Sequence, residues 1–347
     1  MMNNTTKSQV CKASPGTVIT GKWHKKSYRI VRPLGQGANG IVYLAESIDG
    51  PVALKISENG VTITSEVNVL KHFSKVQGSA LGPSFIDVDD WIRPGFSSPI
   101  SFYVMEYIRG ESFLSFIEKR GKEWTGILCL QLLSDLDRLH QEGWVFGDLK
   151  PDNLLVAGNP PKIRCIDVGG TTVQGRAIKE FTEFFDRGYW GAGSRKAEAS
   201  YDLFAVAMII MNTAYPNRFT RADQPVKQLK SIIANTDSLR KFDTVLNHAI
   251  DGKYQRAADM RKDLVMMLSQ VKSSRVKVDQ DPIQKKRATR KSQVNSKATS
   301  HSQARPNLSR ANRQLKPKKQ KGGVLETVLL LLFVSLGYLL YLYGQIL

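Results

Sequence analysis

The sequence predicts an α+β fold, in which a β-rich N-terminal part precedes a larger helical part. Between residues 27 and 105, apolar and polar residues alternate and β-branched and aromatic side chains are frequent, which is typical of strands. Within residues 112–142, 201–211 and 226–271, apolar residues recur at the spacing of amphipathic helices. A basic segment and an uncharged apolar tail follow, so two further parts are expected beyond the globular region.

The composition is that of an ordinary globular chain with an excess of positive charge. The 347 residues are 41% hydrophobic and are enough for one large or two ordinary domains. Cys11, Cys129 and Cys165 lack the spacing of metal or disulfide sites, so simple thiols in a reducing cytosol are expected. Residues 1–24 do not have the pattern of a secretory signal, and none is expected.

The first strands enclose a glycine-rich turn. Gly35, Gly37 and Gly40 lie between an apolar run at 28–31 and the β-branched and aromatic run 41–45. A dinucleotide-binding fold needs a helix after such glycines, whereas this run continues as a strand. Glycines here would let the backbone approach phosphates where a Cβ atom would intrude. The turn is therefore a candidate phosphate-binding loop.

Polar side chains gather around a predicted hairpin at residues 154–166, which contains a Gly-Asn-Pro-Pro turn. Asp148, Lys150 and Asn153 come just before the hairpin and Asp167 comes just after it. A hairpin brings these four residues to one end. Two carboxylates, an amide and an ammonium group suit the binding of Mg²⁺ and a phosphate chain beside a hydroxyl that must lose its proton.

These motifs, in this order over residues 27–270, resemble those of bacterial Hanks-type Ser/Thr protein kinases. The resemblance implies ATP- and Mg²⁺-dependent transfer of the γ-phosphate to Ser or Thr hydroxyls of proteins. It implies Asp148 as the catalytic base and Lys150 beside the transferred phosphoryl group. Asn153 and Asp167 would be the metal ligands.

The resemblance also implies a nucleotide pocket. Lys55 ends a Val-Ala-Leu-Lys strand, would reach the α- and β-phosphates, and would pair with Glu66 of a helix at 65–73. Met105 would lie at the back of the pocket, and Asp202 would anchor the backbone of the catalytic loop. The implied ATP-binding residues are Leu34, Gly35, Gly37, Gly40, Val42, Ala53, Lys55, Glu66, Glu106 (through the backbone of the hinge) and Leu155.

Three departures from the family pattern are visible. The usual His-Arg-Asp reads Phe146-Gly147-Asp148, Asp-Phe-Gly becomes Asp-Val-Gly at 167–169, and residues 188–193 replace Ala-Pro-Glu. Without the arginine there is no buried positive charge for a phosphorylated activation loop to neutralise. Basal activity is therefore expected without activation-loop phosphorylation. The hydroxyls whose joint loss would test this are Thr171, Thr172 and Thr182.

The helical lobe is expected to contain core helices without chemistry of their own. A helix within 112–142 would bury one face, a second would run from about 201 to 211, and two or three more would fill 226–271. The predicted buried face of the helix within 112–142 consists of Ile127, Leu130, Leu133, Leu136 and Leu139.

Residues 272–322 form a predicted disordered linker. They contain 16 Lys and Arg against Asp279 and Asp281, and no Phe, Tyr or Trp. Three interpretations remain open: binding to DNA phosphates, binding to an anionic membrane surface, or a solvated spacer. Residues 285–291 are far from the tail and could reach DNA, and the resemblance to tail-anchored kinases of spore-forming bacilli described below favours DNA. Binding would be independent of sequence without aromatic stacking. DNA could also gather several copies for self-association and trans-autophosphorylation.

The tail at 324–347 is a predicted membrane anchor. Thr327 to Leu347 is 21 residues without a charged side chain, enough to cross a hydrocarbon core of about 30 Å. The preceding cations predict a single-pass protein of the cell membrane with a cytoplasmic catalytic domain. This layout, with an extension at 1–26, a kinase domain at 27–271 (lobes 27–105 and 106–271), the linker and the anchor, is similar to tail-anchored kinases of spore-forming bacilli. That similarity implies a role in sporulation.

Two other functions are compatible with parts of the pattern. A small-molecule phosphotransferase of the aminoglycoside-kinase type shares an Asp and an Asn at Asp148 and Asn153, but usually lacks the glycine-rich turn and the lysine at 150. A non-catalytic DNA–membrane tether on a kinase scaffold would not need Lys55, Asp148, Asn153 and Asp167 intact.

Overall fold

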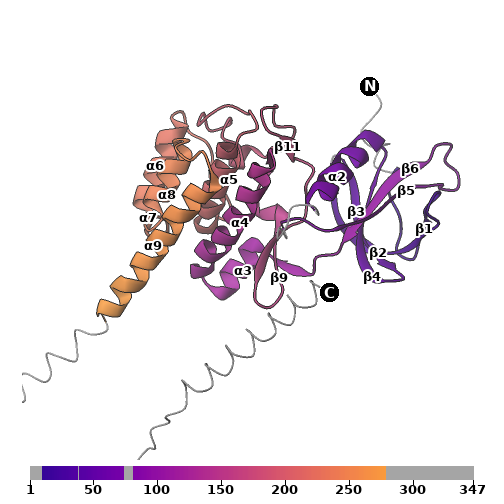
Figure 1. Cartoon of the computed structure of the whole chain (residues 1–347), viewed down its shortest axis with the longest axis horizontal. Helices are drawn as coiled ribbons and strands as arrows, with labels where there is room; N and C mark the ends of the chain where they lie inside the picture. The colour runs from indigo at the N-terminus through magenta and orange to yellow at the C-terminus, as the bar shows by residue number, and fades with distance from the viewer. Residues whose placement is uncertain (1–9, 38, 74–80, 279–347) are drawn as a thin grey trace, which may run out of the picture. The chain divides into compact units, whose positions relative to one another are not determined.

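The computed structural model describes residues 10–37, 39–73 and 81–278, and Figure 1 shows its elements. Within these residues the N-terminal lobe is an antiparallel sheet in the order β1-β2-β3-β4-β6-β5. Helix α2 (Gly60–Phe73) packs against this sheet. The strands are β1 (Val18–Thr20), β2 (Ser27–Gly37), β3 (Gly40–Ser47), β4 (Gly50–Ser57), β5 (Phe85–Trp91) and β6 (Ile100–Glu106).

The strand predicted after the glycine-rich turn is present as β3, in which buried residues alternate with less buried ones. It pairs with β2 through Gly37 opposite Gly40, so the glycines form the connection between two strands and open no helix. The helix predicted from residue 65 begins earlier, at Gly60. The reason is an N-cap, because Asn59 Oδ1 accepts hydrogen bonds from the N–H groups of Val61 and Thr62.

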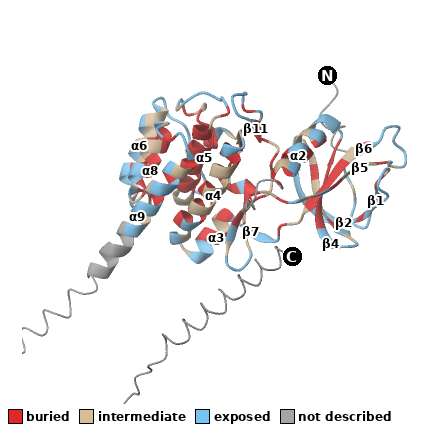
Figure 2. Cartoon of the chain, viewed as in Figure 1, coloured by how far each residue is buried: buried red, intermediate tan, exposed pale blue. Residues whose placement is uncertain are grey.

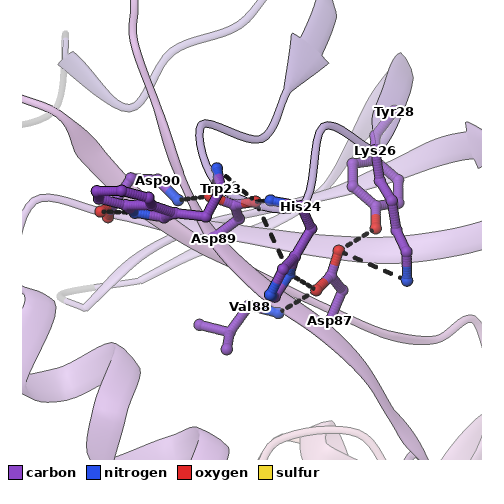
Figure 3. A network of polar contacts seen from close by, with 8 residues as sticks. All are labelled: Trp23, His24, Lys26, Tyr28, Asp87, Val88, Asp89 and Asp90. Atoms are coloured by element: carbon purple, nitrogen blue, oxygen red, sulfur yellow. Dashed lines mark hydrogen bonds and ion pairs between the residues drawn. The ribbon is translucent and has the colours of Figure 1, made fainter.

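Residues 10–26, predicted as an extension, contribute β1 to the sheet and also contact β5. Figure 3 shows the contacts of this segment with β5. Asp89 accepts hydrogen bonds from the backbone N–H groups of Trp23 (2.9 Å) and His24 (2.7 Å). Asp87 lies 2.7 Å from His24 Nδ1 and accepts a hydrogen bond from Tyr28 Oη at 2.7 Å. Two buried carboxylates therefore satisfy the polar groups of the segment that crosses the sheet edge.

The C-terminal lobe is mainly helical and is built around α5, whose residues 203–211 are all buried (Figure 2). This lobe also contains two small sheets, in the orders β10-β9-β7 and β11-β8. The predicted hairpin is β9 and β10, with Leu154 opposite Cys165. The elements are β7 (Gly110–Ser112), α3 (Phe113–Arg120), α4 (Glu123–Gln141), β8 (Trp144–Val145), β9 (Leu154–Ala157), β10 (Lys162–Cys165), β11 (Thr172–Val173), α5 (Ala199–Ala214), α6 (Pro225–Asn235), α7 (Asp237–Arg240), α8 (Asp243–Ile250) and α9 (Ala257–Val278).

The predicted buried face of α4 was wrong at its first position. Ile127 is 43% exposed, and Leu130 is only partly buried. Because α4 contacts α5, β10 and α9, its covered surface is broader than one stripe and is rotated by about one residue. The buried apolar residues are Leu128, Cys129, Leu132, Leu133, Leu136 and Leu139.

The C-terminal helices also differ from the prediction. Four helices rather than two or three cover residues 225–278, because the backbone leaves the helical conformation at Thr236 and at Phe242. Helix α9 ends at Val278, so it continues into the range predicted as disordered linker. No helix within 10–37, 39–73 or 81–278 is long and apolar enough to cross a bilayer. The rest of the linker and the predicted anchor at 324–347 lie outside the described residues.

Candidate active site

A cleft of about 870 Å³ is lined by residues of both lobes. Its walls come from the β2–β3 turn, β4, α2, the segment after β6, the loop at 148–155 and Asp167. Every residue predicted above for catalysis, ATP binding or metal binding lines this cleft. In particular, Lys55 of the N-terminal lobe and Asp167 of the C-terminal lobe face the same space, as one shared nucleotide would require.

Lys55 and Glu66 form the ion pair that the sequence predicts. Lys55 Nζ donates to Glu66 Oε1 at 2.7 Å, and both side chains are buried. Tyr103 Oη donates to the other oxygen, Glu66 Oε2, at 2.9 Å. Burial raises the pKa of the Glu66 carboxyl, and Lys55 and Tyr103 offset part of this effect. Tyr103 was missed, although it lies two residues before Met105 in β6 and both line the cleft.

Asp148 and Lys150 lie together at the bottom of the cleft, with a third residue that the site prediction did not include. Lys150 Nζ is 2.5 Å from Asp148 Oδ2. Thr182 Oγ1 donates to Asp148 Oδ1 at 2.9 Å and accepts from Lys150 Nζ at 2.9 Å. Thr182 is 34 residues from Asp148, and the family landmark that would have located it is replaced at 188–193. It was considered only as a phosphorylation site.

Asn153 and Asp167 line the cleft with side-chain oxygen atoms that could coordinate a cation. Asn153 Nδ2 donates to the carbonyl oxygen of Asp148 at 3.0 Å, which turns the amide so that Oδ1 remains for a cation. Asp167 Oδ1 accepts from Gly169 N–H at 3.0 Å. The described residues contain no group of three or more His, Cys, Asp or Glu placed to hold a metal. One carboxylate, one amide oxygen and nucleotide phosphates fit a hard divalent cation such as Mg²⁺.

The backbone of the catalytic loop is held by Asp202, as the sequence predicts. Asp202 is fully buried near the start of α5. Its Oδ2 accepts from Phe146 N–H at 2.7 Å, and its Oδ1 accepts from Gly147 N–H at 2.9 Å. His140 Nε2 lies 2.9 Å from the same Oδ2 atom. Three hydrogen bonds to one carboxylate position the loop that carries Asp148.

Glu106 lies at the connection between the lobes, where it lines the cleft. Its side chain pairs with Arg164 of β10 at 2.8 Å and accepts from Ser84 N–H at 3.1 Å. Burial raises the pKa of Glu106, but hydrogen bonds from Arg164 and Ser84 outweigh this and lower it. Only the backbone is thus placed to contact a base, and the carboxylate joins this connection to the C-terminal lobe.

The three glycines of the turn have different reasons to be glycine. Gly40 has φ +130°, and a Cβ atom there would lie 2.2 Å from the carbonyl oxygen of Ile56. Cβ atoms at Gly35 and Gly37 would meet nothing within 4 Å, which leaves that space open to a ligand. Asn39, which the prediction did not include, donates to Glu180 Oε1 at 2.5 Å and connects the turn to the segment that precedes Thr182.

A glycine-rich turn over the cleft, a buried Lys–Glu pair in the small lobe and an Asp-x-Lys loop opposite them define the protein kinase class. Comparison with protein families matches residues 28–285 to the protein kinase domain. The chain belongs to this family.

Individual relatives give a finer assignment. The chain is 48% identical over 341 residues to the serine/threonine-protein kinase YabT of Bacillus subtilis strain 168, covering 98% of each chain. It is 24% identical to the probable serine/threonine-protein kinase YbdM (68% of this chain, 88% of YbdM). It is 25% identical to the serine/threonine-protein kinase PrkC (71% and 41%), and both come from the same bacterium. The chain is therefore a Hanks-type Ser/Thr protein kinase similar to YabT. As a member of this family, the chain uses ATP and a divalent metal to phosphorylate proteins.

Proposed function

We propose that the chain is a membrane-anchored, DNA-binding Ser/Thr protein kinase in which Asp148 accepts the proton of the substrate hydroxyl. Lys150 would stabilise the transferred phosphoryl group as a nearby ammonium. Asn153 and Asp167 would hold Mg²⁺, which supplies charge neutralisation at the phosphates. Lys55, oriented by Glu66, would bind the α- and β-phosphates.

The observation that carries this proposal is that the hydroxyl group of Thr182 already lies at hydrogen-bond distance from Asp148, the proposed general base. Thr182 Oγ1 donates to Asp148 Oδ1 while Lys150 contacts both. A Ser or Thr of a substrate that approached Asp148 beside Thr182 would find a proton acceptor and an ammonium at hydrogen-bond distance. The opening of the cleft beside Lys150 is thus suited to a short hydroxyl side chain.

Labelled ATP with the purified chain tests the assignment. Asp148→Asn should lower phosphotransfer to protein by a factor of about 10² or more, because general-base catalysis is lost. Asp152→Asn is the matched control, since it makes the same change in the same loop on a side chain that is 64% exposed and pairs with Arg218. Equal activities of the two variants would contradict the role of Asp148. Label in a small molecule instead of protein would contradict the acceptor class.

The basic segment at 272–322 supports DNA as a partner, through its 16 cations against two acidic residues. Neutralising 6–10 phosphates would make affinity fall by a factor of about 10³–10⁵ between about 50 and 200 mM salt. Binding that does not change over this range would contradict the proposal. If DNA gathers several copies, long DNA should stimulate activity more than short duplexes do. Equal stimulation by both would contradict such gathering.

Two clusters within this segment distinguish DNA from lipid. Replacing the distal cluster, far from the anchor, by Gln should weaken DNA binding and leave binding to anionic vesicles nearly unchanged. Replacing the proximal cluster, next to the anchor, should do more to vesicle binding, because only these cations lie at the membrane surface. The distal cluster is Lys285, Lys286, Arg287, Arg290 and Lys291, and the proximal one is Lys316, Lys318, Lys319 and Lys321.

The uncharged stretch from Thr327 to Leu347 supports a membrane anchor at 324–347. The cations before it favour a cytoplasmic kinase domain. The full chain should stay with membranes after alkaline extraction, whereas a chain that ends at residue 322 should not. Equal partitioning of both would contradict the anchor. The similarity of the layout to tail-anchored kinases of spore-forming bacilli supports a role in sporulation, which loss of spores in a strain carrying Asp148→Asn would test.

A further inference from the structure

The place beside the catalytic Asp148 where the family pattern has an arginine is closed to any side chain. Gly147 has φ +85°, and a Cβ atom on it would lie 2.6 Å from the carbonyl oxygen of Gly170. The same point is 3.6 Å from Ile178 Cδ1. The backbone of Gly170 therefore leaves no room for a side chain at position 147, and Ile178 lies in van der Waals contact with this point.

Ile178 belongs to a small apolar cluster of its own, separate from the two main cores. The cluster consists of Val145, Ile178, Ala197 and Tyr201, and we call it the Ile178 cluster. Ile178 is 7% exposed, and the other three are fully buried. Val145 lies directly before the catalytic loop, and Tyr201 lies next to Asp202 in α5. The cluster thus connects residues 167–182, which we call the activation segment, to the elements that hold Asp148.

Backbone pairing fixes Ile178 at this point. Its N–H group donates to the carbonyl oxygen of Arg195 at 2.9 Å, and Ala197 N–H donates to the carbonyl oxygen of Arg176 at 2.7 Å. The Arg195 guanidinium lies 4.0 Å from the ring centroid of Phe181 and pairs with the buried Asp186 at 2.6 Å. The activation segment is therefore held on both sides of Ile178 by backbone hydrogen bonds and by the contacts of Arg195.

From Ile178 the chain reaches the catalytic base in four residues. Thr182, at the end of this stretch, is the residue whose hydroxyl donates to Asp148. The candidate phosphorylation sites Thr171 and Thr172 are fully buried. Because Thr182 contacts Asp148, replacing Thr182 would disturb the catalytic base directly. A variant with alanine at Thr171, Thr172 and Thr182 therefore cannot report on phosphorylation alone.

We propose that Ile178 is a positioning residue, whose apolar side chain holds the activation segment so that Thr182 meets Asp148, in place of a phosphate–arginine contact. The Ile178 cluster makes the kinase competent without modification of the segment. This inference depends on the protein kinase activity and on neither the DNA nor the membrane proposal.

The experiment uses the full chain after phosphatase treatment, with casein as the acceptor and the first turnovers followed. Ile178→Ala removes the apolar side chain, and Ile178→Val keeps most of it. Ile250→Ala is the matched control, because Ile250 is equally buried but lies in α8, away from the activation segment. Thermal unfolding and the KM for ATP are measured for each variant beside kcat.

Wild-type chain should transfer phosphate after phosphatase treatment without a lag. Ile178→Ala should lower kcat by a factor of about 10 to 10² through misplacement of Thr182, with KM for ATP within about twofold. Ile178→Val should recover kcat to within about threefold of the wild type, and Ile250→Ala should retain it.

Four results would overturn the inference. They are a wild-type chain that is inactive until rephosphorylated, an Ile178→Ala variant as fast as wild type, equal loss of kcat in Ile250→Ala, or a parallel loss of ATP affinity in Ile178→Ala. All four leave the kinase assignment intact. A wild-type chain that transfers no phosphate under any condition would overturn both.

Discussion

Replacing Lys55 by Met isolates the ion pair that joins β4 to α2. In the wild type, Lys55 Nζ lies 2.7 Å from Glu66 Oε1, and both side chains are buried. Removing one partner of such a pair leaves an uncompensated buried charge, which costs about 3–5 kcal/mol of unfolding free energy. Methionine fills much of the same space, so little of this loss comes from a cavity.

The loss should depend on pH in a defined direction. Burial already raises the pKa of Glu66 above its ordinary value in the wild type, and Lys55 lowers it in part. Without Lys55 this pKa rises further. A raised folded-state pKa stabilises the fold at low pH, where the carboxyl is protonated in both states, and this stabilisation is lost as pH rises through the folded-state value. Lys55→Met should therefore cost more at about pH 8 than at about pH 5.

Urea denaturation of the variant and the wild type at both pH values measures this difference. At about pH 5 the loss should fall to about 1–3 kcal/mol, the cost of a missing buried hydrogen-bond partner. The double variant Lys55→Met/Glu66→Gln carries no charge, so its stability relative to wild type should change little with pH and exceed that of Lys55→Met at about pH 8. A loss for Lys55→Met that is equal at both pH values would refute the reasoning.

Three further predictions concern stability. Asp202→Asn should lower the unfolding free energy measured by urea denaturation by about 1.5–3 kcal/mol, because one backbone N–H group loses a charged acceptor. No loss of stability would mean that other contacts hold the catalytic loop. Gly147→Ala and Gly191→Ala both place alanine at positive φ, which should lower the unfolding free energy by about 1–2 kcal/mol each. Only at Gly147 would the new Cβ atom also lie 2.6 Å from a carbonyl oxygen. Gly147→Ala should therefore cost more and lower kcat, and equal costs would argue against the contact. Burial raises the pKa of Asp89, but hydrogen bonds from backbone N–H groups such as that of His24 lower it on balance. Its stabilisation is thus present at neutral pH and lost in acid, so the cost of Asp89→Asn, about 1.5–3 kcal/mol at about pH 7, should shrink toward about pH 3; a cost that grows in acid would contradict this.

The chemistry of the site could be predicted because it is carried by short segments with strong local signals. Asp148, Lys150 and Asn153 share one loop, and a hairpin of two apolar runs brings Asp167 back to them. Lys55 needed only the period of a strand to face the cleft. Such signals depend on neighbours in sequence, which a single chain displays directly.

The residues that were missed depend on contacts between segments far apart in the sequence. Thr182 meets Asp148 across 34 residues, and Asn39 meets Glu180 across 141. No periodicity encodes either distance. Tyr103 differs from these, since it lies on the same face of β6 as Met105, and a strict reading of the strand period would have included it.

The fold shows the same division. Strands and the existence of helices follow from apolar periodicity, but which side of α4 is covered depends on where α9 and α5 lie. The prediction placed Ile127 inside because it considered a single covering surface. The start of α2 was misplaced for a local reason, since the side chain of Asn59 satisfies the first turn and extends the helix toward β4.

The apolar character of the Ile178 cluster has a practical consequence for how this kinase responds to its surroundings. A phosphate–arginine contact is removed by phosphatases and weakened by ionic strength. The apolar contacts of the Ile178 cluster are affected by neither. Apolar contacts instead lose strength on cooling. Raising the salt concentration should therefore leave the catalytic activity of the kinase domain unchanged, whereas cooling should weaken the Ile178 cluster.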